Sequence, residues 1–256
     1  MEVLYMNGAG NDFMVLDARG KTMDFSRMAL ELCRLSGADG FMAVDTSETA
    51  DFKLHFYNSD GTRGEMCGNG ARCICRYAFE KGIAGAHMTV ETDAGPVEGW
   101  RIDENTYRVK LNNPSILDLH RKGEIAYVEL GNPGIPHAVA EYSGDLWKDR
   151  EALKDGMRAL RHDPAFPKGA NVNFYQRLGK NEVRMLTFER GVEDFTLACG
   201  TGTGSTACVL WKLEGLTRLT ARNPGGTLAV EVQGCDGHID SIFLEGPTEI
   251  VKAYNI

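Results

Sequence analysis

The chain has 256 residues, 43% of them hydrophobic, so it can bury the core of one large domain or of two domains of roughly 125 residues, and we expect two. Its formal charge of -8 and the lack of a basic cluster argue against a nucleic-acid or anionic-membrane partner and leave a small polar molecule as the expected one. No apolar run approaches the ~20 residues that span a bilayer, and no basic stretch followed by an apolar one opens the chain. We therefore expect no membrane segment and a cytoplasmic location.

Regular elements alternate with frequent glycine turns along the chain. Short alternating segments predict strands at 51–57, 106–111, 124–130 and 182–188. Helical spacing predicts helices at 25–35, 71–82, 145–155 and 204–215. The pattern indicates a strand-rich α+β protein. The turn-rich segment 111–124 is the best candidate for a boundary, and we place it between the halves 1–117 and 118–247.

Seven cysteines occur in the chain, an odd number in a protein too long to need disulfide staples, so we expect reduced thiols. Cys73 and Cys75 point in different directions on a predicted helix, and no second Cys or His pair has zinc-like spacing, so we expect no metal site. Structural packing is the expected role of Cys33, Cys73, Cys75, Cys208 and Cys235.

Cys67 and Cys199 stand in a duplicated context. Each follows a strand, a polar pair and a turn, and each precedes glycines and a predicted helix. Asn58 and Glu189 hold corresponding places after the two strands, and their spacings to the cysteines differ by one residue. Two homologous halves facing each other would bring equivalent elements to a pseudo-twofold interface, where ligand clefts are common. We therefore expect both cysteines to line one cleft.

A thiol just before the first turn of a helix is close to unpaired backbone N–H groups and to the positive end of the helix dipole, which favours its thiolate near neutral pH. Glycines after both cysteines keep these N–H groups open to a carboxylate. With a carboxylate held between two such helix ends, one sulfur can remove the α-proton while the other supplies a proton from the opposite face. This inversion needs no cofactor. It needs one thiolate and one thiol, because two adjacent anions would repel each other.

Eight motifs extend this pattern over essentially the whole chain. They are GAGNDFMVLD (8–17), SGADG (36–40), YNSDG (57–61), MCGNGARC (66–73), PHAV (136–139), FPKGANVNF (166–174), ERG (189–191) and ACGTGTG (198–204). In this order they resemble the diaminopimelate epimerase family. The resemblance implies two pseudo-symmetric halves, each a curved, mostly antiparallel sheet wrapped around a central helix, with segment 248–256 returning to the first half. It also implies a homodimeric, pyridoxal-independent isomerase that interconverts LL- and meso-2,6-diaminopimelate in lysine and peptidoglycan precursor synthesis.

The same resemblance implies roles for individual residues. Cys67 and Cys199 match the catalytic base and acid. The binding matches are the backbone amides of Gly68, Asn69, Gly200 and Thr201 for the reacting carboxylate, and the side chains of Asn11, Asn58, Asn171, Glu189 and Arg190 for the substrate. Arg190 is expected to pair bidentately with the distal carboxylate. His137 matches a supporting residue near the thiols that tunes their protonation.

Two positions depart from the family pattern. Ile135 stands where the family often has an asparagine that helps to hold the distal amino-acid end, and Phe195 stands where a small or acidic residue is more usual. Both changes make the expected distal pocket more apolar and leave the racemising centre unchanged. A racemase of the same family acting on another amino acid, such as histidine, is therefore the alternative substrate assignment.

Two other classes of function also remain open. A cysteine hydrolase would need one nucleophile, a positioned histidine such as His137, and an oxyanion hole. A non-catalytic amino-acid binding protein would need the glycines and asparagines but neither thiol.

Several of the candidate residues have a purely structural interpretation as well. Asn11 and Asn58 are also typical turn formers, and Glu189 with Arg190 also fits a solvated ion pair. Arg72 can face either a cleft or the solvent, and it is assigned no role.

Overall fold

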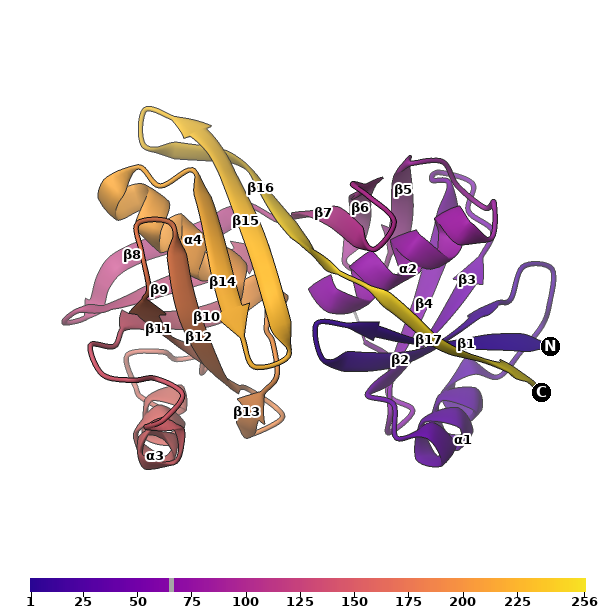
Figure 1. Cartoon of the computed structure of the whole chain (residues 1–256), viewed down its shortest axis with the longest axis horizontal. Helices are drawn as coiled ribbons and strands as arrows, with labels where there is room; N and C mark the ends of the chain where they lie inside the picture. The colour runs from indigo at the N-terminus through magenta and orange to yellow at the C-terminus, as the bar shows by residue number, and fades with distance from the viewer. Residues whose placement is uncertain (65–66) are drawn as a thin grey trace. The chain divides into compact units, whose positions relative to one another are not determined.

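The computed structural model describes residues 1–64 and 67–256 and divides the chain into two compact units (Figure 1). Unit 1 comprises Met1–Lys110 together with Glu245–Ile256, and unit 2 comprises Leu111–Leu244. Helices and strands alternate in both units, which confirms the expected α+β class. Within the described residues, no helix is both long and apolar enough to cross a membrane.

The elements of the two units follow the same order along the chain. Unit 1 is built from β1 (Glu2–Gly8), β2 (Asn11–Asp17), α1 (Phe25–Ser36), β3 (Gly40–Asp45), β4 (Phe52–Asn58), α2 (Gly68–Glu80), β5 (His87–Thr92), β6 (Gly95–Arg101), β7 (Thr106–Leu111) and the C-terminal β17 (Glu249–Asn255). Unit 2 is built from β8 (Pro114–Lys122), β9 (Ile125–Gly131), β10 (Gly134–Glu141), α3 (Arg150–Arg161), β11 (Asn171–Arg177), β12 (Glu182–Glu189), β13 (Asp194–Thr196), α4 (Gly200–Glu214), β14 (Arg218–Asn223), β15 (Gly226–Cys235) and β16 (His238–Pro247), the last of which ends in unit 1.

Strand pairing repeats between the units. In unit 1, β1–β2 is antiparallel, β2–β3 parallel, β3–β4 antiparallel, β4–β5 parallel and β5–β6 antiparallel. In unit 2, the pairs β9–β10, β10–β11, β11–β12, β12–β14 and β14–β15 alternate in the same way. Each parallel pair is joined by a helix, as a parallel crossover requires. An additional antiparallel strand borders each set, β17 beside β1 and β8 beside β9. The predicted duplication of the fold is therefore confirmed.

One helix of each unit is enclosed by its own sheet. Every residue of α2 from Gly68 to Ala78 is buried, and the helix contacts β1, β2, β3 and β6. In α4, Gly200 and the run from Gly202 to Leu210 are buried against β8 to β11, β14 and β15 (Figure 1). A helix buried on every side needs small or apolar residues all round, which explains the Gly, Ala and Cys content of both. This arrangement confirms the expected curved sheet around a central helix.

The outer helices α1 and α3 bury one face each. In α1 the buried residues are Ala29, Leu32 and Cys33, which join a cluster with Phe41 of β3 and Leu16 of β2. In α3 the buried residues are Met157 and Leu160, which join a cluster with Phe166, Leu186 and Phe188. The two clusters hold the outer layer of each unit to its sheet.

Three of the sequence predictions need correction. Segment 111–124 is not a turn-rich connection, because it holds β8, whose mostly polar and partly exposed side chains resemble those of a loop. The helix predicted at 145–155 begins later, because Asp145 accepts a hydrogen bond from the Lys148 backbone N–H at 3.2 Å and turns the chain there. The helices predicted from 71 and 204 begin at Gly68 and Gly200, because packing inside the sheet offsets the low helix propensity of glycine.

Candidate active site

Cys67 is the N-cap residue of α2, as the sequence predicted for a thiol just before a helix. Its backbone is extended, with φ -126° and ψ 122°, and its carbonyl accepts the first helical hydrogen bond from Ala71 at 2.7 Å. The residue is half-buried and is not part of a disulfide. Met66, the first residue of the motif at 66–73, lies outside the described residues. Cys67 is therefore at the amino end of α2, where the helix dipole is positive.

Asn69 and Asn11 meet across unit 1 although they lie far apart in the sequence. The Asn69 Nδ2 donates to Asn11 Oδ1 at 2.6 Å, and the Asn11 Nδ2 donates to Asp39 Oδ2 at 3.1 Å. Asn69 is 2% exposed. The structure therefore brings two of the predicted binding residues together, and Asn11 does more than form a turn.

The turn between β1 and β2 packs against the start of α2. A Cβ atom on Gly8 would lie 2.9 Å from the Asn69 carbonyl oxygen and 2.8 Å from the Cys73 sulfur, so only glycine allows this approach. The turn itself runs through Ala9 and Gly10, which both have positive φ. The close approach fixes Asn11, at the start of β2, beside the first turn of α2.

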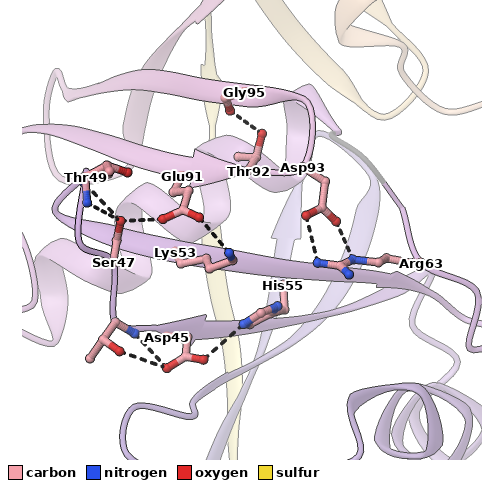
Figure 2. A network of polar contacts seen from close by, with 12 residues as sticks. Asp45, Ser47, Thr49, Lys53, His55, Arg63, Glu91, Thr92, Asp93 and Gly95 are labelled. Atoms are coloured by element: carbon pink, nitrogen blue, oxygen red, sulfur yellow. Dashed lines mark hydrogen bonds and ion pairs between the residues drawn. The ribbon is translucent and has the colours of Figure 1, made fainter.

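The loop that leads from β4 to Cys67 is tied down by polar contacts. Asn58, at the end of β4, is exposed, and its Nδ2 donates to Thr62 Oγ1 at 3.0 Å, which closes a turn. Arg63 bridges back to Tyr57 and forms a two-point ion pair with Asp93, with Nη2 2.8 Å from Oδ1 (Figure 2). Asn58 thus has the turn-forming contact that its local sequence indicated, beside the substrate role that the resemblance implies.

Arg72 was assigned no role from the sequence, and the structure gives it a defined position. Its side chain is 0% exposed. It folds back along its own helix, where Nη1 donates to the Gly68 carbonyl at 3.2 Å and Nη2 donates to Asn69 Oδ1 at 3.0 Å. Arg72 therefore fixes the first turn of α2 from the interior. The signal that could have located it is the Ala and Cys residues around it, which mark a helix buried on all sides.

Cys199 occupies the equivalent N-cap position of α4 in unit 2. Its backbone is extended, with φ -117° and ψ 109°, and its sulfur accepts a hydrogen bond from the Gly202 backbone N–H at 3.3 Å. The Thr201 hydroxyl lies 3.5 Å from the same sulfur. Cys199 is 7% exposed and is not part of a disulfide. The Cys199 sulfur therefore lies within reach of hydrogen-bond donors in the first turn of α4.

His137 of β10 is connected to the start of α4 through Asn173 of β11. The Asn173 Nδ2 donates to His137 Nδ1 at 3.1 Å, so the ring is held with its hydrogen on Nε2, which has no hydrogen-bond partner in the described part of the chain. The Asn173 amide is oriented by Thr187, whose hydroxyl donates to Oδ1 at 3.0 Å. Burial, with the charge of Arg190 as the smaller cause, lowers the pKa of His137 to about 3. His137 is therefore a neutral hydrogen-bond donor at physiological pH.

Asn171 and Arg190 also meet in unit 2. The Arg190 backbone N–H donates to Asn171 Oδ1 at 2.8 Å, and the Arg190 Nη1 donates to the Lys168 carbonyl at 3.1 Å. Asn171 is buried, whereas Arg190 is exposed, and Glu189 precedes it as the last residue of β12. The guanidinium is anchored at one nitrogen and keeps its other donors near the surface.

The two departures from the family pattern lie on different elements. Ile135 is half-buried on β10, where it is opposite Leu130 of β9. Phe195 lies on β13, packs edge-on against Phe188 with ring centroids 5.9 Å apart, and has the Arg150 guanidinium over its ring at 4.9 Å. Phe195 is therefore a packing residue of the α3 side of unit 2.

The remaining cysteines are structural or exposed. Burial raises the pKa of Cys33 to about 11 and the pKa values of Cys73, Cys75 and Cys208 to about 12, which keeps these thiols protonated. The packing prediction is wrong for Cys235, which is exposed because the last three residues of β15, 233–235, extend beyond the core. None of the seven cysteines, all of which the structure describes, is part of a disulfide. Among the described residues, no group of three or more His, Cys, Asp and Glu side chains is arranged to hold a metal ion.

Comparison with known proteins places this arrangement in a family. The family model described as diaminopimelate epimerase matches residues 3–117 and 126–251. A diaminopimelate epimerase from Chlorobaculum tepidum is 36% identical over 96% of this chain and 97% of its own length. Another from Aquifex aeolicus is 38% identical over 85% of this chain and 84% of its own length. The chain belongs to the diaminopimelate epimerase family.

Solved structures extend the comparison at the level of the fold. A PhzF-family phenazine biosynthesis protein from Bacillus anthracis has a TM-score of 0.75 and 16% identity, with 100% of this chain and 98% of that chain covered. A probable proline racemase from Agrobacterium radiobacter has a TM-score of 0.68 and 16% identity, with 100% and 92% covered. This chain therefore shares its fold with proteins of distant sequence.

Proposed function

We propose that this protein interconverts LL- and meso-2,6-diaminopimelate, and is thus an isomerase. The observation that carries the proposal is family membership along nearly the whole chain, with relatives named diaminopimelate epimerase. The alternative, a racemase for histidine, is not favoured, because these relatives carry the diaminopimelate name. By inference from the same relatives, the reaction serves lysine and peptidoglycan precursor synthesis.

Cys67 and Cys199 are the proposed base and acid. Both are N-cap residues with extended backbones and neither is part of a disulfide, so a thiolate at either position would be stabilised by a helix N-terminus. In the proposed reaction, one sulfur as thiolate takes the α-proton while the other as thiol delivers a proton to the opposite face. The roles exchange in the reverse direction. The two-base step uses only protons that the two sulfurs carry, so it requires no cofactor.

The reacting carboxylate is proposed to bind the helix N-termini. The backbone N–H groups involved are those of Gly68, Asn69, Gly200 and Thr201, which belong to the first turns of α2 and α4 and have no partner within a helix. The α C–H next to a carboxylate is a weak acid, so donors that stabilise the charge developing on the oxygens lower the barrier.

The distal part of the substrate is proposed to contact Asn58, Asn171, Glu189 and Arg190. Arg190 suits the distal carboxylate, because one guanidinium nitrogen is anchored on Lys168 and the rest of its planar donor set remains for a bidentate pair. His137 is proposed to support the Cys199 side through its Nε2–H. The apolar Ile135 is proposed to border this distal end.

The protein is further proposed to be a cytoplasmic homodimer, as the family resemblance implies. Light scattering coupled to size-exclusion chromatography would test the dimer. A mass of one chain, 28.1 kDa, across micromolar concentrations would contradict it.

The experiment that tests the function is epimerisation in deuterated water. LL-diaminopimelate should give the meso isomer with solvent deuterium at one α-carbon, and L-histidine should give neither inversion nor exchange. Cys67→Ala and Cys199→Ala should each lower inversion by about 10³-fold. Cys235→Ser, which alters an exposed thiol, is the matched control and should retain activity.

Three outcomes would contradict the proposal in different ways. Inversion of histidine without inversion of either diaminopimelate isomer would overturn the substrate. Loss of turnover with only one of the two cysteine substitutions would favour a cysteine hydrolase. Binding of the amino acid without any hydrogen exchange in the unmodified protein would favour a non-catalytic binding protein.

A further inference from the structure

Arg72 is a buried cation held by neutral groups. Its guanidinium donates to a peptide carbonyl of Gly68 and to the side-chain amide of Asn69, and neither acceptor carries a charge. The side chain is 0% exposed, and its Nε has no hydrogen-bond partner in residues 1–64 and 67–256. A charge in such a place is unfavourable unless an anion compensates it.

The titratable groups around Arg72 are thiols. They are Cys73, Cys67 and Cys75, the first and last of which lie fully buried in α2. Burial raises the pKa of both Cys73 and Cys75 to about 12, so they remain neutral. Cys67 differs, because it is half-buried and lies at the helix N-terminus, where an anion is favoured. Of the three thiols, Cys67 is the one that can supply the compensating negative charge.

Other charged groups near this end of α2 do not neutralise Arg72. Asp12 of β2 acts on Cys73 and accepts a hydrogen bond from Asn7 at 2.8 Å, and Asp39 accepts from Asn11 and from the Asp12 backbone. Arg76, one turn further along α2, donates to the Thr248 carbonyl. None of these three charged groups is hydrogen-bonded to Arg72, whose guanidinium bonds to the first turn itself.

The start of α4 lacks this cation. The position equivalent to Arg72, five residues after the N-cap cysteine, is Gly204, where a Cβ would meet Leu111 at 2.6 Å. The groups that contact the Cys199 sulfur include the Gly202 N–H and the Thr201 hydroxyl, and the neutral His137 is bonded to Asn173, whose Oδ1 lies against Gly202. The charged Arg190 is exposed and bonded to Lys168. Cys199 is also the more buried of the two thiols, which disfavours its charged form.

We propose that Arg72 is a positioning residue that makes Cys67, and not Cys199, the ionised sulfur of the resting protein. This inference rests on the proposed two-base function for its purpose, since that reaction needs one thiolate and one thiol before substrate arrives. Being fully buried, Arg72 acts through the first turn of α2 and does not touch the substrate. Its hydrogen bond to Asn69 Oδ1 also orients the Asn69 amide toward Asn11. One side chain therefore supplies the positive charge and fixes the position of Asn69.

The test measures thiolate formation directly and needs no substrate. The full-length protein is treated with iodoacetamide between pH 5 and 9.5, and the alkylation rate of each cysteine is followed by peptide mass spectrometry. Each rate is normalised to its own plateau at high pH, which removes differences in exposure. In the unmodified protein, Cys67 should reach half of its plateau at least one pH unit below Cys199, about a tenfold difference in rate at the lower midpoint.

Substitutions identify Arg72 as the cause. Arg72→Gln keeps hydrogen-bonding capacity but removes the charge, and it should raise the Cys67 midpoint by about one pH unit or more. Arg72→Lys keeps the charge and should stay closer to the unmodified protein. Arg76→Gln is the matched control, since it neutralises the other buried arginine of α2, and it should leave the order of Cys67 and Cys199 unchanged.

A midpoint for Cys199 at or below that of Cys67 in the unmodified protein would overturn the proposal, whether or not any variant folds. An unchanged Cys67 midpoint in folded Arg72→Gln would overturn it as well. Failure of the proposed epimerase function would be distinguishable, because the protein would not invert diaminopimelate while the alkylation midpoint of Cys67 would still lie below that of Cys199.

Discussion

The first turns of α2 and α4 have nearly the same backbone and different surroundings. Cys67 and Cys199 both cap a buried helix with extended φ and ψ, and both are followed by glycine at the first and third helical positions. The first turn of α2 is bonded to the cation of Arg72, whereas the neighbours of the first turn of α4 include the neutral Thr201 hydroxyl and, through Asn173, a neutral histidine. A duplicated fold thus supplies two equivalent thiols, and side chains in the second layer make them unequal.

The difference matters because a two-base inversion fails when both sulfurs have the same protonation state. Identical surroundings would give coupled titrations, with no preference for which thiol ionises first. Different buried neighbours give one thiol a preference to ionise first, and they do so without changing the backbone at either cysteine. The duplication therefore provides geometry, and the later divergence of side chains provides the charge pattern.

The largest expected difference between the first turns of α2 and α4 comes from replacing one glycine in each turn with alanine. Gly202→Ala would place a Cβ 2.1 Å from Asn173 Oδ1 and 3.2 Å from the Cys199 sulfur, whereas Gly70→Ala meets Met42 at 3.3 Å. The first change should lower the free energy of unfolding by about 2 kcal/mol through overpacking and displace the Asn173 contact to His137. Activity should fall by about 100-fold. Urea unfolding and steady-state kinetics measure both.

Gly70→Ala is the matched substitution three residues after the other cysteine. Its contacts need shifts of only a few tenths of an ångström, and alanine gains up to about 1 kcal/mol of helix propensity, so stability should stay near that of the unmodified protein. Equal losses in the two variants would contradict the view that the turn of α4 is the more tightly packed.

The next effect is a pH dependence of the free energy of unfolding that comes from His137 of unit 2. The pKa of His137 is about 3 in the folded protein, against 6.5 when the chain is unfolded, so between these values the unfolded state binds the extra proton. This contribution to stability is complete above pH 6.5 and is lost as the pH falls, by about 1.4 kcal/mol per unit. Urea unfolding at pH 6.5 and pH 5 should show a loss of about 2 kcal/mol from this residue.

His137→Gln should remove that part of the pH dependence, whereas His238→Gln, at an exposed position on β16, should retain it. The same slope in His137→Gln and in the unmodified protein would mean that His137 ionises in the folded state. If so, its role as a neutral donor would have to be abandoned.

Sequence reasoning located the two N-cap cysteines because helix starts have local signatures, namely glycines before a helical pattern. It located Asn11 and Asn171 through the family resemblance, and the structure gives both residues hydrogen bonds to other candidate residues. Arg72 was missed, because the hydrophobic period alone does not reveal that a helix is enclosed on every side; the Ala and Cys residues around Arg72 were the available signal. Asn173 was missed although it lies two residues from Asn171 and so shares its face of β11.

The sequence could not provide the contacts that support the candidate site residues from behind. The contact of Asn173 with His137 joins neighbouring parallel strands, and the packing of Gly8 on Asn69 joins a turn to a helix 61 residues later in the chain. Such contacts depend on the register of pairing and on three-dimensional approach, which a single sequence leaves open.

The smallest expected effect concerns the segments that lead to the two cysteines. The described part of the loop before Cys67 is held by the bridge between Tyr57 and Arg63 and by the exposed Arg63–Asp93 ion pair (Figure 2). The segment before Cys199 is held by the three-residue pairing of β13 with β12, to which the Lys154–Asp194 ion pair adds little. Arg63→Gln should therefore change kcat/KM by roughly threefold and the free energy of unfolding by less than about 1 kcal/mol.

Lys154→Gln removes an ion pair of similar exposure beside the other thiol and should have less than half that effect, because backbone pairing already fixes β13. Raising the salt to about 0.5 M should reproduce the Arg63→Gln change in the unmodified protein, since exposed charge pairs are screened at that ionic strength. Kinetics of both variants at low and high salt decide the matter. An effect of Lys154→Gln as large as that of Arg63→Gln would show that strand pairing does not protect the approach to Cys199, and the structural contrast between the two segments would then have no functional consequence.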